Sequence, residues 1–182
     1  LIINTIIITI LKNMKKFTFL LTVHGYNNSY SGGIIGYAED TATIRYCFNK
    51  GTIKTANNYE ESNISYVAKV GGIMGDGAKA NKIEYCYNVG SLNVSGATKG
   101  IDGGISTCAV SCKYCYNVCS ISKGYGICPK GSGATNCYYV STKESSVGAA
   151  KTTTVMQSSS TVVLLNAATD AYQIDNENIN NG

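Results

Sequence analysis

"GGIIGYAEDTATIRYCFNKGTIK" at residues 32–54 aligns without a gap with "GGIMGDGAKANKIEYCYNVGSLN" at residues 71–93. Each copy opens with Gly-Gly-Ile and carries Tyr-Cys-aromatic-Asn, and the cysteine lies 14 positions after the second glycine in both. A third copy runs from Gly103 to Asn117 and a weaker fourth from Gly126 to Tyr138, and in each of these the cysteine lies only 11 positions after the glycine. Self-similarity of this kind predicts a repeat architecture.

Each copy divides into short strands that glycine and asparagine separate. In the first copy these strands are "IIGYA", "IRYCFN" and "TIKT". We expect the glycines to serve turns that need positive φ. Three short strands per repeat with glycine-marked corners predict an all-β fold, a parallel β-solenoid of about four coils, in which equivalent residues stack in rows about 4.8 Å apart.

Alternation along the kernel predicts which side chains face the interior. Cys47, Asn49 and Ile53 share one side of the chain, which favours an internal cysteine row, an asparagine ladder at the turn and an apolar row. The opposite arrangement buries the aromatic residues with Ile44, and a bulge near Arg45–Tyr46 would place both Ile44 and Cys47 inside. We favour the cysteines inside because free cysteine is so often buried.

With the cysteines inside, the aromatic residues of the kernel form an outer stripe. Such rings could stack on sugars, because each offers a broad apolar face and a polar tip. Packing between coils explains the same rings without a ligand, and it is the simpler interpretation. The candidate binding residues are Tyr46, Phe48, Tyr85, Tyr87, Tyr114 and Tyr116.

Composition narrows the classes of function. Charged residues make up 14% of the chain, the net charge is +4, and there is no dense run of lysine and arginine, so nucleic-acid binding gains no support. The one histidine, His24, leaves little room for histidine-based catalysis. The apolar runs near the N-terminus are shorter than the ~20 residues of a membrane span, so we expect no transmembrane segment in this chain.

The repeats divide the chain into three parts. Residues 1–16 are an uncertain N-terminal segment that could supply strands of an earlier coil, and residues 17–143 form the solenoid. "FTFLLTV" at residues 17–23 is interpreted as the closing strand of a preceding coil rather than as the core of a signal peptide. Residues 144–182 form a closing segment in which Ser158–Ser160 could cap a helix over 162–168, followed by a polar end at 174–182.

The quoted kernels resemble GLUG-motif repeats, which occur in large bacterial surface and secreted proteins, including IgA-peptidase-like and adhesin-like chains. The resemblance covers about residues 17–143, and the Asn-rich tail is similar to the segment that often closes such arrays. In that pattern a further apolar strand follows "NINNG", so we expect that the chain is truncated. The resemblance implies an extracellular or cell-surface location.

A cluster of cysteines offers a competing interpretation. "CAVSCKYC" at residues 108–115 fits the C-x3-C-x2-C spacing of radical-SAM iron–sulfur sites. However, Cys115 and Tyr114 occupy repeat positions, and the 67 residues after Cys115 show no strand–helix alternation for a cofactor-binding barrel. Cys112 aligns with Ile44, and Cys128 aligns with another apolar row. A four-thiolate metal site remains an alternative, as do buried thiols with one or two disulfides. The roles of Cys108, Cys112 and Cys119 stay open.

The sequence therefore favours a non-enzymatic repeat segment of a bacterial surface or secreted protein, without cofactor. It would act as a stalk or an adhesive surface toward host or cell-surface glycans or proteins. One alternative is an accessory repeat region of a secreted hydrolase or peptidase, and the other is a thiolate metal-binding or radical-SAM protein.

Overall fold

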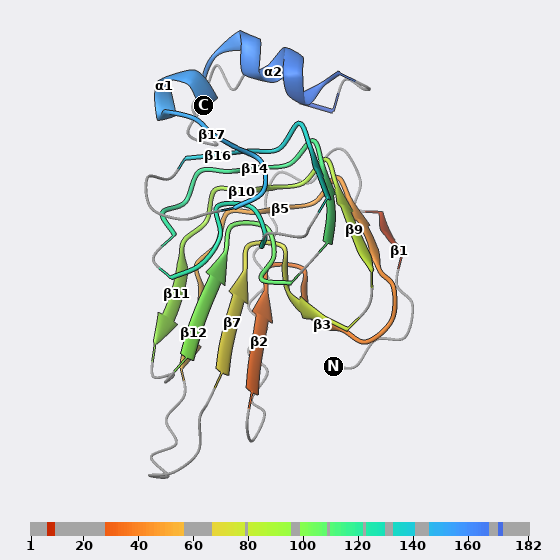
Figure 1. Cartoon of the computed structure of the whole chain (residues 1–182), viewed down its shortest axis with the longest axis vertical. Helices are drawn as coiled ribbons and strands as arrows, with labels where there is room; N and C mark the ends of the chain where they lie inside the picture. Colours follow the sequence, from red (N-terminus) through yellow and green to blue (C-terminus); the bar gives the residue numbers. More distant parts are fainter. Residues whose placement is uncertain are drawn as a thin grey trace.

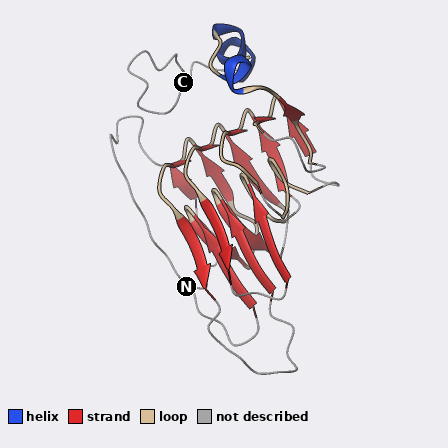
Figure 2. Cartoon of the chain, turned by 90° about the vertical axis from the view of Figure 1, so that its left-hand side faces the viewer, coloured by secondary structure: helices blue, strands red, loops and turns tan. Residues whose placement is uncertain are grey.

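The fold is a parallel β-solenoid that a short helical segment closes at one end (Figures 1 and 2). A computed structural model describes residues 7–9, 28–56, 67–78, 80–95, 99–108, 110–121, 123–129, 133–140, 146–167 and 171–172. All strand pairs in this part of the chain are parallel. The predicted fold class is confirmed.

Each repeat contributes one strand to several stacked sheets. Two sheets run through the length of the solenoid. The first contains β1 (Ile7–Thr9), β4 (Thr43–Arg45), β9 (Asn81–Glu84), β13 (Val110–Lys113) and β15 (Gly133–Thr135). The second contains β5 (Phe48–Asn49), β10 (Tyr87–Asn88), β14 (Tyr116–Asn117), β16 (Tyr138–Tyr139) and β17 (Ala149–Ala150). Three smaller sheets complete the coils: β2 (Asn28–Gly32), β7 (Val67–Gly71) and β12 (Lys99–Gly103); β3 (Ile35–Ala38) and β8 (Met74–Gly77); and β6 (Ile53–Ala56) and β11 (Leu92–Ser95).

The strand register reproduces the alignment of the repeats. Ile44 pairs with Ile83, and Ile83 pairs with Cys112. Tyr87 pairs with Phe48 on one side and Tyr116 on the other. Stacking therefore places equivalent residues in rows, as the self-similarity predicted. The described residues do not include "FTFLLTV", His24 or the tail at 174–182, so the predictions for them stay untested.

The segment "IRYCFN" is two strands rather than the single strand predicted. Its first part is β4 and its last part is β5, and these belong to different sheets. Tyr46 lies between them with φ of 55°, and Tyr85 and Tyr114 repeat this left-handed conformation at 54° and 53°. A single residue in the left-handed conformation turns the chain sharply. This corner, rather than a bulge, lets Ile44 and Cys47 both face the interior.

The Gly-Gly pairs serve close approach of the backbone, not positive φ as predicted. Among the described residues, left-handed φ values belong to Tyr46, Tyr85, Tyr114, Asn136 and Gly148. A Cβ atom on Gly72 would instead overlap the carbonyl oxygen of Gly104 in the next coil and lie 2.6 Å from Cγ of Asn88. Glycine is thus required here because stacked coils and the asparagine side chain leave no space for a methyl group.

Apolar side chains from successive coils fill the interior. The predicted inward orientation of the cysteines is confirmed, since Cys86 and Cys115 have no exposed surface and Cys47 has 1%. The isoleucines pack with them in one cluster. The fully buried large members of this core are Ile44, Ile73, Met74, Ile83, Ile105 and Ile127.

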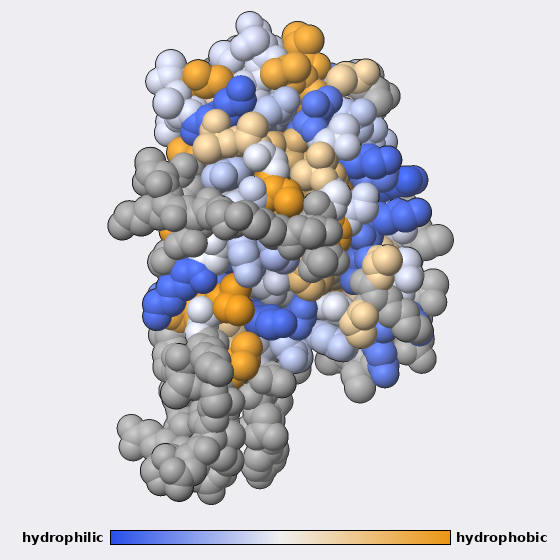
Figure 3. Space-filling model, viewed as in Figure 1, coloured by the Kyte–Doolittle hydropathy of each residue, from blue (hydrophilic) through white to orange (hydrophobic). Residues whose placement is uncertain are grey.

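A helical segment covers the C-terminal end of the solenoid. It consists of α1 (Thr153–Met156) and α2 (Ser159–Leu165). Ser158 caps α2 through a bond from the Thr161 amide, as predicted, but the helix begins and ends three residues earlier than the predicted range 162–168. Met156 and Leu165 pack against Tyr138. Apolar side chains remain on the outside of this end (top of Figure 3). Val163 of α2 is 69% exposed. No helix in the described ranges is long and apolar enough to cross a membrane.

Candidate functional site

The left-handed corner carries a column of three tyrosines on the outside of the solenoid. Tyr46 stacks on Tyr85 with ring centroids 5.1 Å apart, and Tyr85 stacks on Tyr114 at 5.0 Å. The ring planes differ by only 7° and 1°. We call these three residues the corner row. Because neighbouring rings occupy each other's faces, the column presents mainly ring edges and hydroxyl groups to solvent.

A second column lies two residues further along the chain. Phe48 stacks on Tyr87 at 5.1 Å, and Tyr87 stacks on Tyr116 at 4.9 Å. We call Phe48, Tyr87 and Tyr116 the sheet row. Tyr138 of β16 pairs with Tyr116 of β14 and continues this row beneath the helical segment. The predicted aromatic stripe is therefore two separate rows.

The two rows differ in what covers them. The ring of Tyr172 lies 5.6 Å from Tyr116 and 6.4 Å from Tyr87, so the C-terminal segment packs over the sheet row. The hydroxyl of Tyr172 donates to the carbonyl of Tyr114 at 2.6 Å, and burial raises its pKa well above the usual value. In the corner row, by contrast, Tyr46 is 38% exposed. The corner row is the more accessible of the two.

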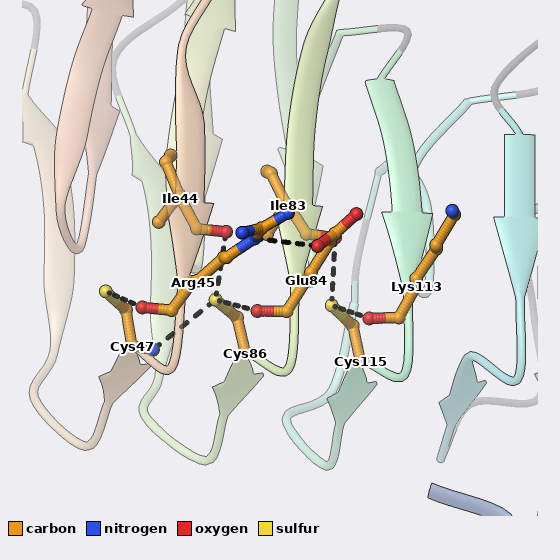
Figure 4. Close-up of polar contacts among 8 residues, drawn as sticks. All are labelled: Ile44, Arg45, Cys47, Ile83, Glu84, Cys86, Lys113 and Cys115. Carbon is orange, nitrogen blue, oxygen red and sulfur yellow. Dashed lines mark hydrogen bonds and ion pairs between the residues drawn. The ribbon is translucent and has the colours of Figure 1, made fainter. Parts of the chain in front are cut away.

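Thiols hold the corner from the inside (Figure 4). Cys47 Sγ donates to the carbonyl of Arg45 at 3.1 Å, and Cys86 and Cys115 make the same bond to the carbonyl two residues earlier, each at 3.2 Å. Cys115 Sγ also reaches the carbonyl of Ile83 in the preceding coil at 3.5 Å. The cysteine row thus gives hydrogen-bond partners to backbone carbonyls at the corner, which an aliphatic side chain could not do.

An asparagine ladder follows directly after the cysteine row. Asn49 Nδ2 donates to Asn88 Oδ1 at 2.8 Å, and Asn88 Nδ2 donates to Asn117 Oδ1 at 2.9 Å. Each Oδ1 also accepts the amide N–H two residues later, from Gly51, Gly90 and Cys119. The predicted ladder is confirmed. It ties neighbouring coils together and shapes the turn within each coil.

Charged side chains lie directly before the corner row, at the ends of β4 and β9. Arg45 Nε lies 2.8 Å from Glu84 Oε2, and this ion pair links the first two copies (Figure 4). Burial, together with Tyr114, raises the pKa of Tyr85. The hydroxyl of Tyr85 is therefore protonated at neutral pH and can donate a hydrogen bond as well as accept one.

The cysteines of the radical-SAM-like spacing lie in different rows. Cys108 Sγ is 3.3 Å from the hydroxyl of Ser106, Cys112 occupies the isoleucine row in the core, and Cys119 replaces the turn glycine. Every cysteine of the chain is among the described residues, and all eight are thiols. Within the described ranges, no group of three or more histidine, cysteine, aspartate or glutamate side chains is arranged to hold a metal ion.

The sequence predicted one aromatic stripe, and it did not predict the division into two rows or the cover over one of them. The left-handed φ of the repeat tyrosines separates the two rows, and a tyrosine in a sequence does not predict this conformation. Asparagine at the equivalent position in the fourth copy, Asn136, is the one hint in the sequence, because asparagine tolerates that conformation well.

Comparison with known proteins bears on the repeat kernel. No curated protein and no solved structure matches the chain. The family model of the GLUG motif matches residues 27–54, which hold the first copy with its Gly-Gly pair, corner and turn. The chain therefore carries a GLUG motif, as the resemblance of its repeats predicted.

Proposed function

We propose that this chain is a non-enzymatic repeat segment of a bacterial cell-surface or secreted protein, in which a solenoid stalk displays a binding surface for glycans. The GLUG motif fits a repeat domain of a larger protein. The observation that carries the binding proposal is the corner row, in which tyrosines of three successive copies stack at about 5 Å on the outside of the solenoid.

The geometry of the corner row favours a particular mode of binding. Stacked rings offer no free faces between them, so a sugar would contact the row of edges and hydroxyl groups. Phenolic hydroxyls donate and accept hydrogen bonds, which suits the hydroxyl groups of a glycan. A repeated row also spreads binding over several weak contacts along the stalk. Such contacts combine when a polymeric ligand engages more than one of them.

Glycan binding is tested with variants of the corner row. Replacing Tyr46, Tyr85 and Tyr114 by asparagine should keep the corner conformation, because Asn136 already adopts it, while removing the phenol groups. We expect binding on a glycan array to fall at least tenfold. Replacing Tyr87 and Tyr116, which Tyr172 partly covers, should change binding little. Equal binding by the wild type and the triple variant would rule out the corner row.

The location is tested separately. Antibodies against residues 28–140 should label intact cells of the source organism, or detect the protein in the culture medium. Brief protease treatment of intact cells should remove the surface signal. Labelling that requires permeabilised cells would contradict a surface or secreted location, whatever the glycan array shows.

A further inference from the structure

Two cysteines that the repeat does not require meet in the core of the solenoid. Cys112 lies in β13 in the row of Ile44 and Ile83. Cys128 lies in the next copy, one residue after Ile127, whose carbonyl accepts bonds from the amides of Ile105 and Ser106. Both side chains are completely buried, and their Sγ atoms are 3.2 Å apart.

The positions of this pair differ from the equivalent positions in earlier coils. The row of Cys112 holds isoleucine in the first two copies, and the row of Cys128 holds Ile35 and Met74. The third copy has cysteine in the first row and Ser106 in the second, whereas the fourth copy has Ala134 in the first row and cysteine in the second. The two cysteine side chains touch across these neighbouring coils. The four cysteines of the repeat kernel instead donate to carbonyls two residues earlier, which directs their sulfurs toward the backbone.

We propose that Cys112 and Cys128 form a disulfide that links the third and fourth copies of the repeat. A disulfide has an S–S bond of about 2.0 Å, so the two sulfurs need to approach by roughly 1 Å. In the reaction one cysteine thiolate attacks a disulfide oxidant such as glutathione disulfide, which forms a mixed disulfide and releases one glutathione thiolate. The second cysteine thiolate then attacks the cysteine sulfur of the mixed disulfide and releases the other glutathione thiolate. The S–S bond of the oxidant breaks as the new S–S bond forms, and the two cysteine protons end on the two glutathione thiols that are released.

Burial determines when this bond can form. Hydrogen bonds to Cys115 and Cys128, together with burial, raise the pKa of Cys112 well above the usual value for a thiol. A buried protonated thiol reacts slowly, because the thiolate is the nucleophile. The bond should therefore form while the chain folds, before the last coils close. Once closed, it should resist soluble reductants until the coil opens.

The bond is detected by refolding the full chain from urea in a buffer of reduced and oxidised glutathione. Free thiols are then alkylated in denaturant and the protein is digested with trypsin. Cleavage after lysine leaves Cys112 in residues 100–113 and Cys128 in residues 124–130. We expect these two peptides to be recovered as one species that reductant separates.

Two variants assign the link to particular residues. Cys108 shares a tryptic peptide with Cys112, so Cys108→Ala should preserve the linked species and Cys112→Ala should abolish it. Recovery of both peptides with alkylated cysteines in the wild type would overturn the proposal. A link that persists in Cys112→Ala, or one that joins the peptide of Cys115 and Cys119 instead, would also overturn it.

Stability gives a second readout that does not depend on recovering peptides. The oxidised wild type should unfold at a higher urea concentration than the protein refolded under reducing conditions, because the bond restricts the unfolded chain. Cys128→Ala should unfold at the same urea concentration in both buffers. Equal midpoints for the oxidised and reduced wild type would contradict a disulfide in the core.

Discussion

The inner and outer sides of the corner follow different rules, although they alternate along the same four residues. On the inner side, Cys47 and Asn49 form hydrogen bonds to the backbone or to the next coil. On the outer side, Tyr46 and Phe48 contact the equivalent rings of the next coil. The inner side chains are surrounded by protein, whereas the outer side chains have one edge toward solvent.

This difference shows which positions the solenoid needs and which it leaves for function. An inner residue is part of a ladder, so its loss leaves polar groups unpaired in a buried place. An outer residue contributes ring contacts that are worth about 1 kcal/mol or less beyond burial. We therefore expect inner substitutions to change stability, and outer substitutions to change binding with small effects on stability.

The largest effect is expected where the inner side meets the Gly-Gly pair. Gly72→Ala places a methyl group against the Gly104 carbonyl and the Asn88 side chain, so the two coils must separate. We expect a loss of at least about 3 kcal/mol in unfolding free energy, or failure to fold. Gly133→Ala is the matched control, because the nearest atom to its added Cβ is 4.0 Å away. Urea unfolding of both variants tests this, and equal losses would contradict the close-approach argument.

The asparagine ladder should show the next largest effect. Asn88→Ala removes two side-chain bonds to neighbouring asparagines, at 2.8 and 2.9 Å, from a residue with no exposed surface. We expect the unfolding free energy to fall by about 2 kcal/mol. Asn93→Ala, at an exposed position of β11, should change it by less than about 0.5 kcal/mol. A similar small loss for both variants would show that the ladder does not stabilise the stacked coils.

The inner side of the solenoid could be predicted from the sequence, and the outer side only in part. Gap-free alignment fixed the register, and with it the cysteine row and the asparagine ladder, because parallel stacking places equivalent residues together. The alternation of side chains then left two arrangements open. Burial of free cysteine was sufficient to choose between them.

Two features of the outer side could not be predicted from the repeat pattern. A tyrosine with left-handed φ is uncommon, so the division of "IRYCFN" into two strands could not be foreseen from Tyr46 or Tyr85. The cover over the sheet row comes from Tyr172, which is 56 residues beyond Tyr116 in the sequence. No repeat pattern relates these two residues.

A smaller effect is expected from the pH dependence of the inner thiols. Burial raises the pKa of Cys119 to about 12, whereas the unfolded thiol ionises near 9.0. Between these values the unfolded chain has released its proton and the folded protein has not, so stability falls as pH rises. At pH 10 the ionisation of this residue in the unfolded chain should lower the unfolding free energy by roughly 1 kcal/mol relative to neutral pH.

The variant Cys119→Ala isolates this contribution. In a reducing buffer, its unfolding free energy should fall less between pH 7 and pH 10 than that of the wild type. Ser120→Ala, at the exposed neighbouring position, should keep the wild-type pH dependence. Identical pH profiles for the wild type and Cys119→Ala would mean that the buried thiol ionises as readily as an unfolded one.

The smallest effect distinguishes the two outer rows from each other. Tyr85 has a left-handed φ of 54°, whereas Tyr87 lies in the strand β10. Asparagine tolerates the left-handed region and valine does not, but valine favours strands. At Tyr85 we therefore expect Asn to be more stable than Val by about 1 kcal/mol, and at Tyr87 the order should reverse by a similar or smaller amount. Urea unfolding of the four variants measures both differences. The same preferred residue at both sites would mean that the corner does not constrain its tyrosine, and the triple asparagine variant would then no longer be a conservative test of binding.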